Sequence, residues 1–513
     1  MNQKAEKGMG LAKRWSGIAT PTLLIVLCFL SRLPQLMSGN LLLDGDESIV
    51  GLMAKHVAEG KEFPLFFYGQ SYGFSAIENC FGAFFFKLFG MNTMALKLAM
   101  LSLWSIGIVF YYKTFFLISN NKKTALLLTL LLIFIPPWAV WSMKARGGYL
   151  SAFTLSAMAI YWLIKLKYKR SIIISFIIGF VIGIITLSQP LWIPGLIPII
   201  VYSFWDKKRI REVLLLIAGI VICMALIKVL IPHKDSDYWS PTIFSIPHLM
   251  QTITALPELL FNHFAGMIDP GESTETGTFS GILSLVWIGF ICLGMGIQLY
   301  RMYSKKQHPI ASVFMLSSLL TMSYIFILKE GFSSRYLLPL SGYLVLWIGV
   351  EFTSVAMNTK IFKMLMNGVL IVVILLGVCS VLEFRDYSTL PEMPNKQHTE
   401  QQNIDELTTY LETNNIHYAY SLDPYLQWQI MFYSKEKITS RYLFEDERCP
   451  LLPPLVDAAL RDGKPTAIIG YIYALEGLET MVNKDSLIHE VSTRYFVYKN
   501  PTEAQLKSLK FEF

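Results

Sequence analysis

The stretch LLLDGDESIVGLMAKHVAEGK, residues 41–61, places Asp44, Asp46 and Glu47 within four positions of one another. It follows an apolar run, about residues 17–37, that is long enough to cross a bilayer. Carboxylates are costly close to lipid, and a membrane protein that gathers several at the mouth of a span usually uses them. The sequence therefore points to chemistry at a membrane surface.

The composition is that of an integral membrane protein. Of the 513 residues, 53% are hydrophobic and only 16% are charged. Repeated apolar runs of ~17–25 residues, separated by short charged or Pro/Gly-containing connections, predict a polytopic helical protein. The net charge of +7 falls mostly in short loops, which indicates orientation in the membrane rather than nucleic-acid binding. The six cysteines form no CxxC pair and support neither a zinc site nor a disulfide framework.

The distribution of basic residues predicts the topology. The segment 74–90 is short and carries charged residues. If it lies at the membrane interface and does not cross the bilayer, all later basic loops fall on the cytoplasmic side. This threading gives about eleven spans in a multi-pass cell (inner) membrane protein with a cytoplasmic N-terminus. It places outside the first loop (residues 38–93), the turn 141–149, the long loop 232–277, the turn 329–336 and everything after about residue 383.

Two domains are predicted. Residues 1–386 form an all-α membrane domain, and residues 387–513 form a small extracytoplasmic α/β domain, because this tail is more charged and its apolar residues alternate or cluster in short runs. Helices are expected at IDELTTYLETN (404–414) and PLVDAALRDG (454–463). Strands are expected at 417–421, 437–444, 466–473 and around 492–500.

An amphipathic helix that lies on the membrane is predicted after the acidic cluster. Ile49, Met53 and Val57 recur every four positions, and Gly60 is a natural helix stop. The next segment, FPLFFYGQSYG (63–73), is aromatic and can line a groove for a sugar or a lipid chain. Its candidate substrate-binding residues are Tyr68, Gln70 and Tyr72.

The acidic cluster has two interpretations. Capping explains Asp44 and Glu47, because an acid at the N-cap with a second acid three residues later is a capping-box variant, and the helix dipole favours acids in a first turn. Capping does not require Asp46. The chemical interpretation therefore depends on Asp46.

In combination, these features resemble the GT-C superfamily of integral-membrane glycosyltransferases. The order is a basic N-terminus, a first span, a loop in which an Asp-Glu pair opens a helix, a YGQ-x-Y segment, and a short aromatic helix that ends in LFG. The likeness is strongest to the bacterial branch that includes protein mannosyltransferases and the aminoarabinose transferase of lipid A. It covers roughly residues 14–382.

The resemblance implies transfer of a sugar from a polyprenyl-phosphate donor to a lipid, envelope glycan or protein acceptor on the extracytoplasmic side. The family's first-loop catalytic aspartate would correspond to Asp46, with Glu47 as its neighbour and Asp44 among the substrate-binding residues. A positioned carboxylate can take the proton of an acceptor hydroxyl as that oxygen attacks the anomeric carbon. A single displacement of this kind inverts the anomeric centre.

The leaving lipid phosphate gains negative charge, so it needs cations nearby. Arg335 and Tyr336 lie in SSRYLLPL, which matches the family's RYLLP-like segment, and Lys144 and Arg146 lie in WSMKARGGY. Each cation has the alternative of snorkelling to headgroups. Family members often carry a lysine near the aromatic segment of the first loop, whereas this chain reads YGQSYG there. The candidates for that role are Gln70, Tyr72, Lys61 and Arg335.

No cofactor is firmly implied, although a divalent metal ion is compatible with the sequence. His233, Asp235 and Asp237 alternate in HKDSDYW, but a solvated loop explains this pattern better, and we assign no metal ligand. His263, on a mixed apolar helix, is expected to be packed rather than to bind a metal.

Three other function classes stay open. A flippase or transporter of lipid-linked sugars would place charges near span centres and show two related halves, and neither is evident here. An O-antigen-ligase-like glycan ligase or polymerase would need neither an acidic first loop nor a folded tail. A sensor in which the C-terminal tail is the functional domain is not supported by any sequence motif. All of these function classes place the protein among membrane lipids, and none involves nucleic acid.

Overall fold

The computed structural model describes residues 3–38, 41–70, 73–230, 246–267, 277–304, 308–327, 333–355, 360–385, 400–443, 447–475 and 488–513. The chain folds into two compact units. The first unit comprises Met1–Gln35, Met100–Met143 and Tyr149–Arg385. The second comprises Leu36–Ala99, Lys144–Gly148 and Asp386–Phe513. The second unit thus groups the predicted first loop with the C-terminal part of the chain.

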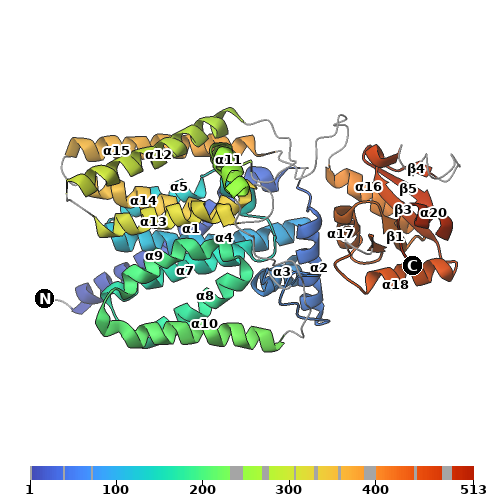
Figure 1. The fold of residues 1–513 in the computed structure, drawn as a ribbon, viewed down its shortest axis with the longest axis horizontal. Coiled ribbons are helices and arrows are strands. Elements are labelled where there is room, and N and C mark those ends of the chain that lie inside the picture. The colour runs from blue at the N-terminus through green and yellow to red at the C-terminus, as the bar shows by residue number, and fades with distance from the viewer. Residues whose placement is uncertain are drawn as a thin grey trace. The chain divides into compact units, whose positions relative to one another are not determined.

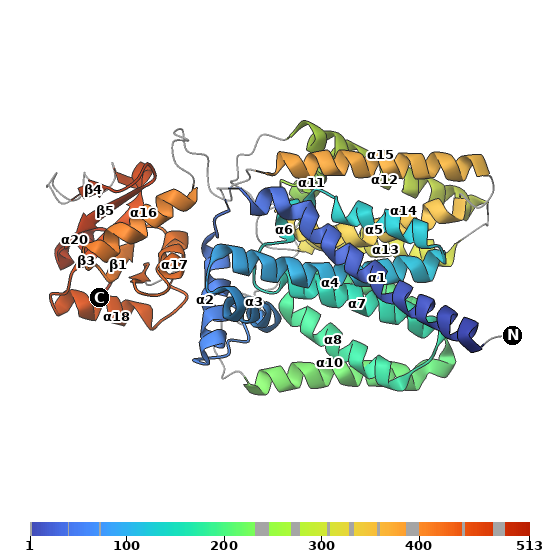
Figure 2. The ribbon, with the colours of Figure 1, turned by 180° about the vertical axis from the view of Figure 1, so that it is seen from behind.

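The first unit is helical, and its long helices run along a common direction (Figure 1, Figure 2). Its elements are α1 (Gln3–Leu36), α4 (Thr93–Ser119), α5 (Lys122–Ile133), α6 (Pro137–Trp141), α7 (Tyr149–Tyr168), α8 (Ile172–Ser188), η1 (Pro190–Trp192), α9 (Ile193–Phe204), η2 (Lys207–Arg209), α10 (Ile210–Leu230), α11 (Ile246–Phe264), α12 (Thr278–Tyr303), α13 (Pro309–Ser323), η3 (Tyr324–Ile327), η4 (Ser334–Leu337), α14 (Leu338–Val355) and α15 (Lys360–Glu383).

The protein is a multi-pass membrane protein. Seven helices in the described part of the chain are long and apolar enough to cross a bilayer, and α8 and the η1–α9 segment are shorter apolar helices. The predicted total of about eleven is not confirmed by this number. The predicted interfacial segment forms α3 (Ala76–Phe89), whose 14 residues span ~21 Å, which is less than the ~30 Å of a hydrocarbon core.

Exposed apolar side chains mark the surfaces that meet lipid. Leu214, Val221, Leu285 and Leu299 on α10 and α12 each expose more than half of their area. In water such contiguous apolar faces would favour aggregation, whereas acyl chains solvate them. The most apolar window of α10 is only 22% buried within the protein, as expected for a helix at the lipid boundary.

One buried guanidinium organises the turn between α5 and α6. Arg32 of α1 is fully buried and donates to Ser142 Oγ at 2.8 Å, to the Ile133 carbonyl at 2.8 Å and to the Trp138 carbonyl at 3.0 Å. Its guanidinium also lies over the Trp104 ring, 5.0 Å from the centroid. A charge this deep is tolerated only because its donors meet carbonyls and a π face.

The second unit contains α2 (Gly45–Glu59), α3, the first turns of α4, and a C-terminal α/β segment. The elements of that segment are α16 (Glu400–Thr413), β1 (Tyr418–Ser421), α17 (Pro424–Tyr433), β2 (Thr439–Arg441), α18 (Leu452–Arg461), β3 (Thr466–Tyr471), η6 (Ile472–Ala474), β4 (Ile488–Glu490), β5 (Tyr495–Lys499) and α20 (Glu503–Ser508). Figure 1 shows α16 and α17 on one side of the sheet and α20 on the other.

The sheet has the order β2-β1-β3-β5-β4. Strand β1 pairs in parallel with β2 and β3, whereas β5 runs antiparallel to both β3 and β4. Every residue of β3 is buried, which agrees with its near-continuous apolar sequence TAIIGY. The predicted α/β class, both predicted helices and all four predicted strands are confirmed; β4, which has only three residues, was not predicted.

We expect Arg32→Met to destabilise the protein by about 3 kcal/mol, because it removes the Arg32 donor from the Ile133 carbonyl and one of two donors from the Trp138 carbonyl in a buried turn. Thermal unfolding of the full chain in lipid nanodiscs measures the effect. The exposed Arg211 on α10 is a matched control, since Arg211→Met removes the same charge from the surface. Equal stability of the two variants would contradict the role given to Arg32.

Candidate active site

The start of α2 is a complete capping box. Asp44 occupies the N-cap, and its Oδ1 accepts from the Glu47 N–H at 2.9 Å. The Glu47 carboxylate reaches back to the Asp44 N–H at 3.4 Å. At the other end, Gly60 adopts φ +71°, a left-handed conformation that glycine tolerates without a steric penalty. The predicted helix start and stop are both confirmed.

Glu47 is buried, and its oxygens are engaged. Oε1 accepts from Lys97 Nζ at 2.5 Å and from the Ala145 N–H at 3.2 Å, while Oε2 completes the capping box. Its side chain has no exposed area, and that of Lys97 is 5% exposed. These contacts favour a positioning role for Glu47, which joins α2, α4 and the segment 144–148.

Asp44 is held by two cations of the segment 144–148. Arg146 Nη2 donates to Asp44 Oδ2 at 2.5 Å, and Lys144 Nζ lies 3.6 Å from the same oxygen. Burial alone would raise the pKa of Asp44, but Arg146, Lys144 and the Glu47 N–H together hold it well below its usual range. Asp44 is therefore a permanent anion within a buried cluster.

Asp46 is the carboxylate of this cluster that reaches solvent. Its side chain is 20% exposed, compared with 8% for Asp44. Oδ2 lies 3.3 Å from Arg146 Nη1, and Oδ1 accepts from Arg448 Nη1 at 3.0 Å. Arg146 therefore bridges Asp44 and Asp46, so the cap of α2 and the more exposed acid share one guanidinium.

Arg448 was missed by the sequence analysis. It comes from the C-terminal segment, 402 residues away from Asp46, and it follows Glu447. The Glu447 carboxylate accepts from the backbone of Tyr442 and Cys449, at 3.1 and 3.0 Å, which fixes the local turn. No periodicity or motif marks Arg448, and only the fold brings it to the first loop.

The aromatic segment of the first loop forms a tight turn beside Arg448. The Phe67 N–H donates to the Gly73 carbonyl at 3.2 Å, and the Gln70 N–H donates to the Phe67 carbonyl at 3.0 Å. The Arg448 guanidinium lies over the Phe67 ring at 5.2 Å. Gly69 has φ +73°, and a Cβ on it would come within 2.9 Å of the Arg448 backbone.

The remaining predicted site residues are placed differently. Tyr72 lies outside the described residues, and Lys61 is exposed and pairs with Glu59 at 2.8 Å. Arg335 belongs to the first unit, where its guanidinium lies over the Tyr336 ring at 5.2 Å. The start of η4 that carries both is held by His263, which is buried and bonds to the Ser334 carbonyl at 3.2 Å and to Ser341 Oγ at 3.0 Å.

The described residues provide no group of three His, Cys, Asp or Glu side chains that could hold a metal ion. His233, Asp235 and Asp237 lie outside the described part of the chain. The acids at the start of α2 face cations rather than one another.

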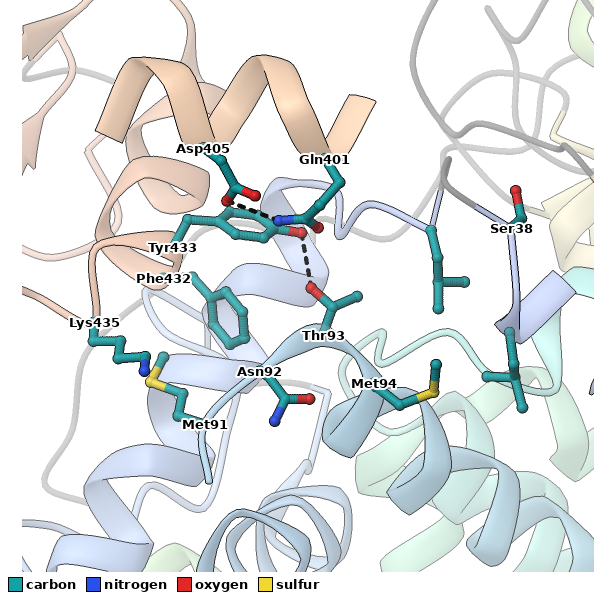
Figure 3. A pocket seen from close by; sticks show the side chains of 12 residues that line it. Ser38, Met91, Asn92, Thr93, Met94, Gln401, Asp405, Phe432, Tyr433 and Lys435 are labelled. Carbon is teal, nitrogen blue, oxygen red and sulfur yellow. Dashed lines mark hydrogen bonds between the residues drawn. The ribbon is translucent and has the colours of Figure 1, made fainter. Parts of the chain in front are cut away.

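A cavity of about 410 Å³ also lies in the second unit. Figure 3 shows a hydrogen bond between the Tyr433 and Thr93 hydroxyls in its lining, and the two oxygens are 3.0 Å apart. Its lining combines Met91, Met94 and Phe432 with polar groups from α16. None of the predicted site residues lines this cavity.

The far end of α2 is tied to the end of α17 by charged side chains. His56 Nε2 lies 2.8 Å from Glu436 Oε1, and Nδ1 lies 2.8 Å from both Glu62 Oε1 and the Tyr68 hydroxyl. Lys55 also contacts Glu436. The hydrogen bond that His56 makes to the Glu436 carboxylate is the main reason that the pKa of His56 is raised. Burial raises the pKa of Glu436, but His56 and Lys55 outweigh it and lower the pKa to about 2.

The fold is similar to that of solved structures of ArnT. Two solved structures share it: ArnT from Cupriavidus metallidurans bound to undecaprenyl phosphate, with a TM-score of 0.60, and the same protein in the apo state, with a TM-score of 0.58. Each is 12% identical in sequence, and they cover 96% and 97% of this chain and 99% of their own. No family model and no curated protein matches the sequence. The predicted GT-C resemblance is confirmed at the level of fold.

The His56 cluster predicts a pH-dependent contact between α2 and α17. Because the folded-state pKa of His56 is raised, its contribution is complete below the unfolded pKa of about 6.5 and is lost as the pH rises through the folded value. We expect amide protection factors in both helices to fall as the pH rises above about 6.5. His56→Gln should remove this pH dependence, whereas the exposed His417→Gln should keep it. Protection that changes equally with pH in all three proteins would contradict the assignment.

Proposed function

We propose that this protein is a membrane glycosyltransferase that transfers a sugar from a polyprenyl-phosphate donor to a lipid, envelope glycan or protein acceptor. The observation that carries the proposal is the setting of Asp46, a partly exposed carboxylate fixed between two guanidiniums at the start of α2. The fold supports it, because ArnT, which shares this fold, has been solved with undecaprenyl phosphate bound.

The cations beside Asp46 suit a phosphate-bearing donor. Arg146 Nη1 lies 3.3 Å from Asp46 Oδ2, and Arg448 Nη1 donates to Asp46 Oδ1 at 3.0 Å. The two arginine side chains are 14% and 34% exposed. Guanidiniums in such a position can stabilise a leaving phosphate as it gains charge.

In this mechanism, Asp46 acts as the general base. It accepts the proton of the acceptor hydroxyl while the acceptor oxygen attacks the anomeric carbon and the bond from that carbon to the phosphate oxygen breaks. The phosphate leaves with the electron pair, and the single displacement inverts the anomeric centre. Asp44 and Glu47 position the helix start, since both are engaged by other groups.

The predicted cations take different parts in this scheme. Lys144 is fully buried against Asp44 and supports the loop, whereas Arg146 is partly exposed and reaches both Asp44 and Asp46. Arg335 and Tyr336, at the start of η4, are proposed donor contacts, and Tyr68 and Gln70 are proposed sugar contacts. No metal ion takes part in the scheme.

We expect Asp46→Asn to lower sugar transfer roughly 10²–10⁴-fold, because the amide keeps the shape of the side chain and loses its basicity. Transfer of label from radiolabelled polyprenyl-phosphate sugars in membranes, at matched expression, measures this. Glu59→Gln, an exposed acid on the same helix, is the control and should transfer normally. Near-normal turnover by Asp46→Asn would remove the general-base role.

The proposed orientation has the N-terminus in the cytoplasm and the second unit on the extracytoplasmic side. A reporter enzyme that is active only outside, fused after Phe513, should therefore be active, and the same reporter placed in the basic connection at residues 165–170 should be inactive. The reverse pattern would place the proposed active site on the wrong side for a donor presented outside.

A further inference from the structure

Arg448 and Arg146 both contact Asp46, but they are held very differently. Arg146 is anchored by Asp44 at 2.5 Å, and its side chain is 14% exposed. Arg448 has Asp46 as its only carboxylate partner among the described residues, and its side chain is 34% exposed. Its guanidinium also lies over the Phe67 ring. Of the two guanidiniums, Arg448 is the one that can exchange its partner at small cost.

The paired state limits Asp46 as a base. A carboxylate that accepts from one guanidinium at 3.0 Å and lies 3.3 Å from a second has fewer lone pairs to offer to an acceptor hydroxyl. Release of one cation would free an oxygen of Asp46 for that hydroxyl. Arg146 cannot leave without also exposing the buried charge of Asp44, which would be costly.

The backbone at Arg448 is fixed while its side chain is not buried. The turn at Gly69 approaches the Arg448 backbone so closely that a Cβ there would lie 2.8 Å from Arg448 Cβ and 2.9 Å from its Cα. Glu447 fixes the adjacent backbone through Tyr442 and Cys449. The guanidinium can therefore move by a change of side-chain rotamer while the backbone of Arg448 stays in place.

We propose that Arg448 binds the phosphate of the polyprenyl-phosphate donor and releases Asp46 in doing so, so that donor binding frees the base. This inference rests on the proposed function and deepens it. The incoming phosphate oxygen replaces the Asp46 carboxylate as the acceptor of the Arg448 N–H groups. Asp46 then accepts the proton of the acceptor hydroxyl, the anomeric carbon–oxygen bond breaks toward the phosphate, and the dianion that forms is paired with Arg448.

The test is binding of undecaprenyl phosphate, with undecaprenol as the phosphate-free probe, to the full chain in nanodiscs. Affinity is read from ligand-dependent thermal stabilisation. We expect the wild type to bind only the phosphate, Arg448→Gln to bind it at least tenfold more weakly, and Arg448→Lys to retain most of the affinity. Lys507→Gln removes an exposed cation from α20 and should match the wild type.

Asp46→Asn gives a prediction of opposite sign. If Asp46 and the phosphate compete for Arg448, this variant should bind undecaprenyl phosphate severalfold more tightly, and the double variant with Arg448→Gln should lose that gain. A merely structural Arg448 would not produce this pattern, since breaking its contact from either side would then weaken binding.

The outcomes separate the two proposals. Wild-type affinity in Arg448→Gln, or weaker binding in Asp46→Asn, would overturn the role of Arg448 and leave the glycosyltransferase proposal standing. Failure of the wild type to bind undecaprenyl phosphate better than undecaprenol would overturn the polyprenyl-phosphate donor itself, and the role of Arg448 with it.

Discussion

Asp44 caps α2 and at the same time holds the Glu47 N–H, the Arg146 guanidinium and the Lys144 ammonium. The site depends on this one carboxylate. Without it the first turn of α2 loses its cap, and Arg146 loses the partner that keeps it beside Asp46. The geometry of the more exposed acid is thus set by a buried neighbour two residues earlier, and a change at Asp44 would act on Asp46 through Arg146.

The second unit shows how a membrane protein builds a polar site with precision. The groups that form it come from the start of α2, from the first turns of α4, from the segment 144–148 and from the C-terminal segment. Each contributes between one and three charges, and each of these charges has an opposite neighbour. Buried ion pairs add little net stability because desolvation offsets attraction, but they penalise any other arrangement. Their contribution here is to fix geometry.

Local patterns predicted local structure well. The capping box at Asp44, the helix stop at Gly60 and the apolar run in TAIIGY each depend on residues a few positions apart, and each was confirmed. The long-range hydrogen-bond partners of the charged side chains were not predictable. Lys97 for Glu47, Ser142 for Arg32 and Arg448 for Asp46 lie 50 to 402 positions away, and a lone lysine or arginine has no period. The sequence identified the acids and two of the cations, Lys144 and Arg146, whereas only the fold identified Lys97 and Arg448.

The sequence separation between Asp46 and Arg448 has a consequence for biosynthesis. A ribosome adding roughly 5–20 residues per second needs ~20–80 s to travel from the first residue to the second, so the start of α2 is in place long before Arg448 exists. During that interval Arg146 is the one of the two guanidiniums that Asp46 can contact. A chain that ends prematurely after the last membrane helix keeps its spans and its acids but never gains the second guanidinium. Asp46 can thus gain its second guanidinium only after translation has passed Arg448.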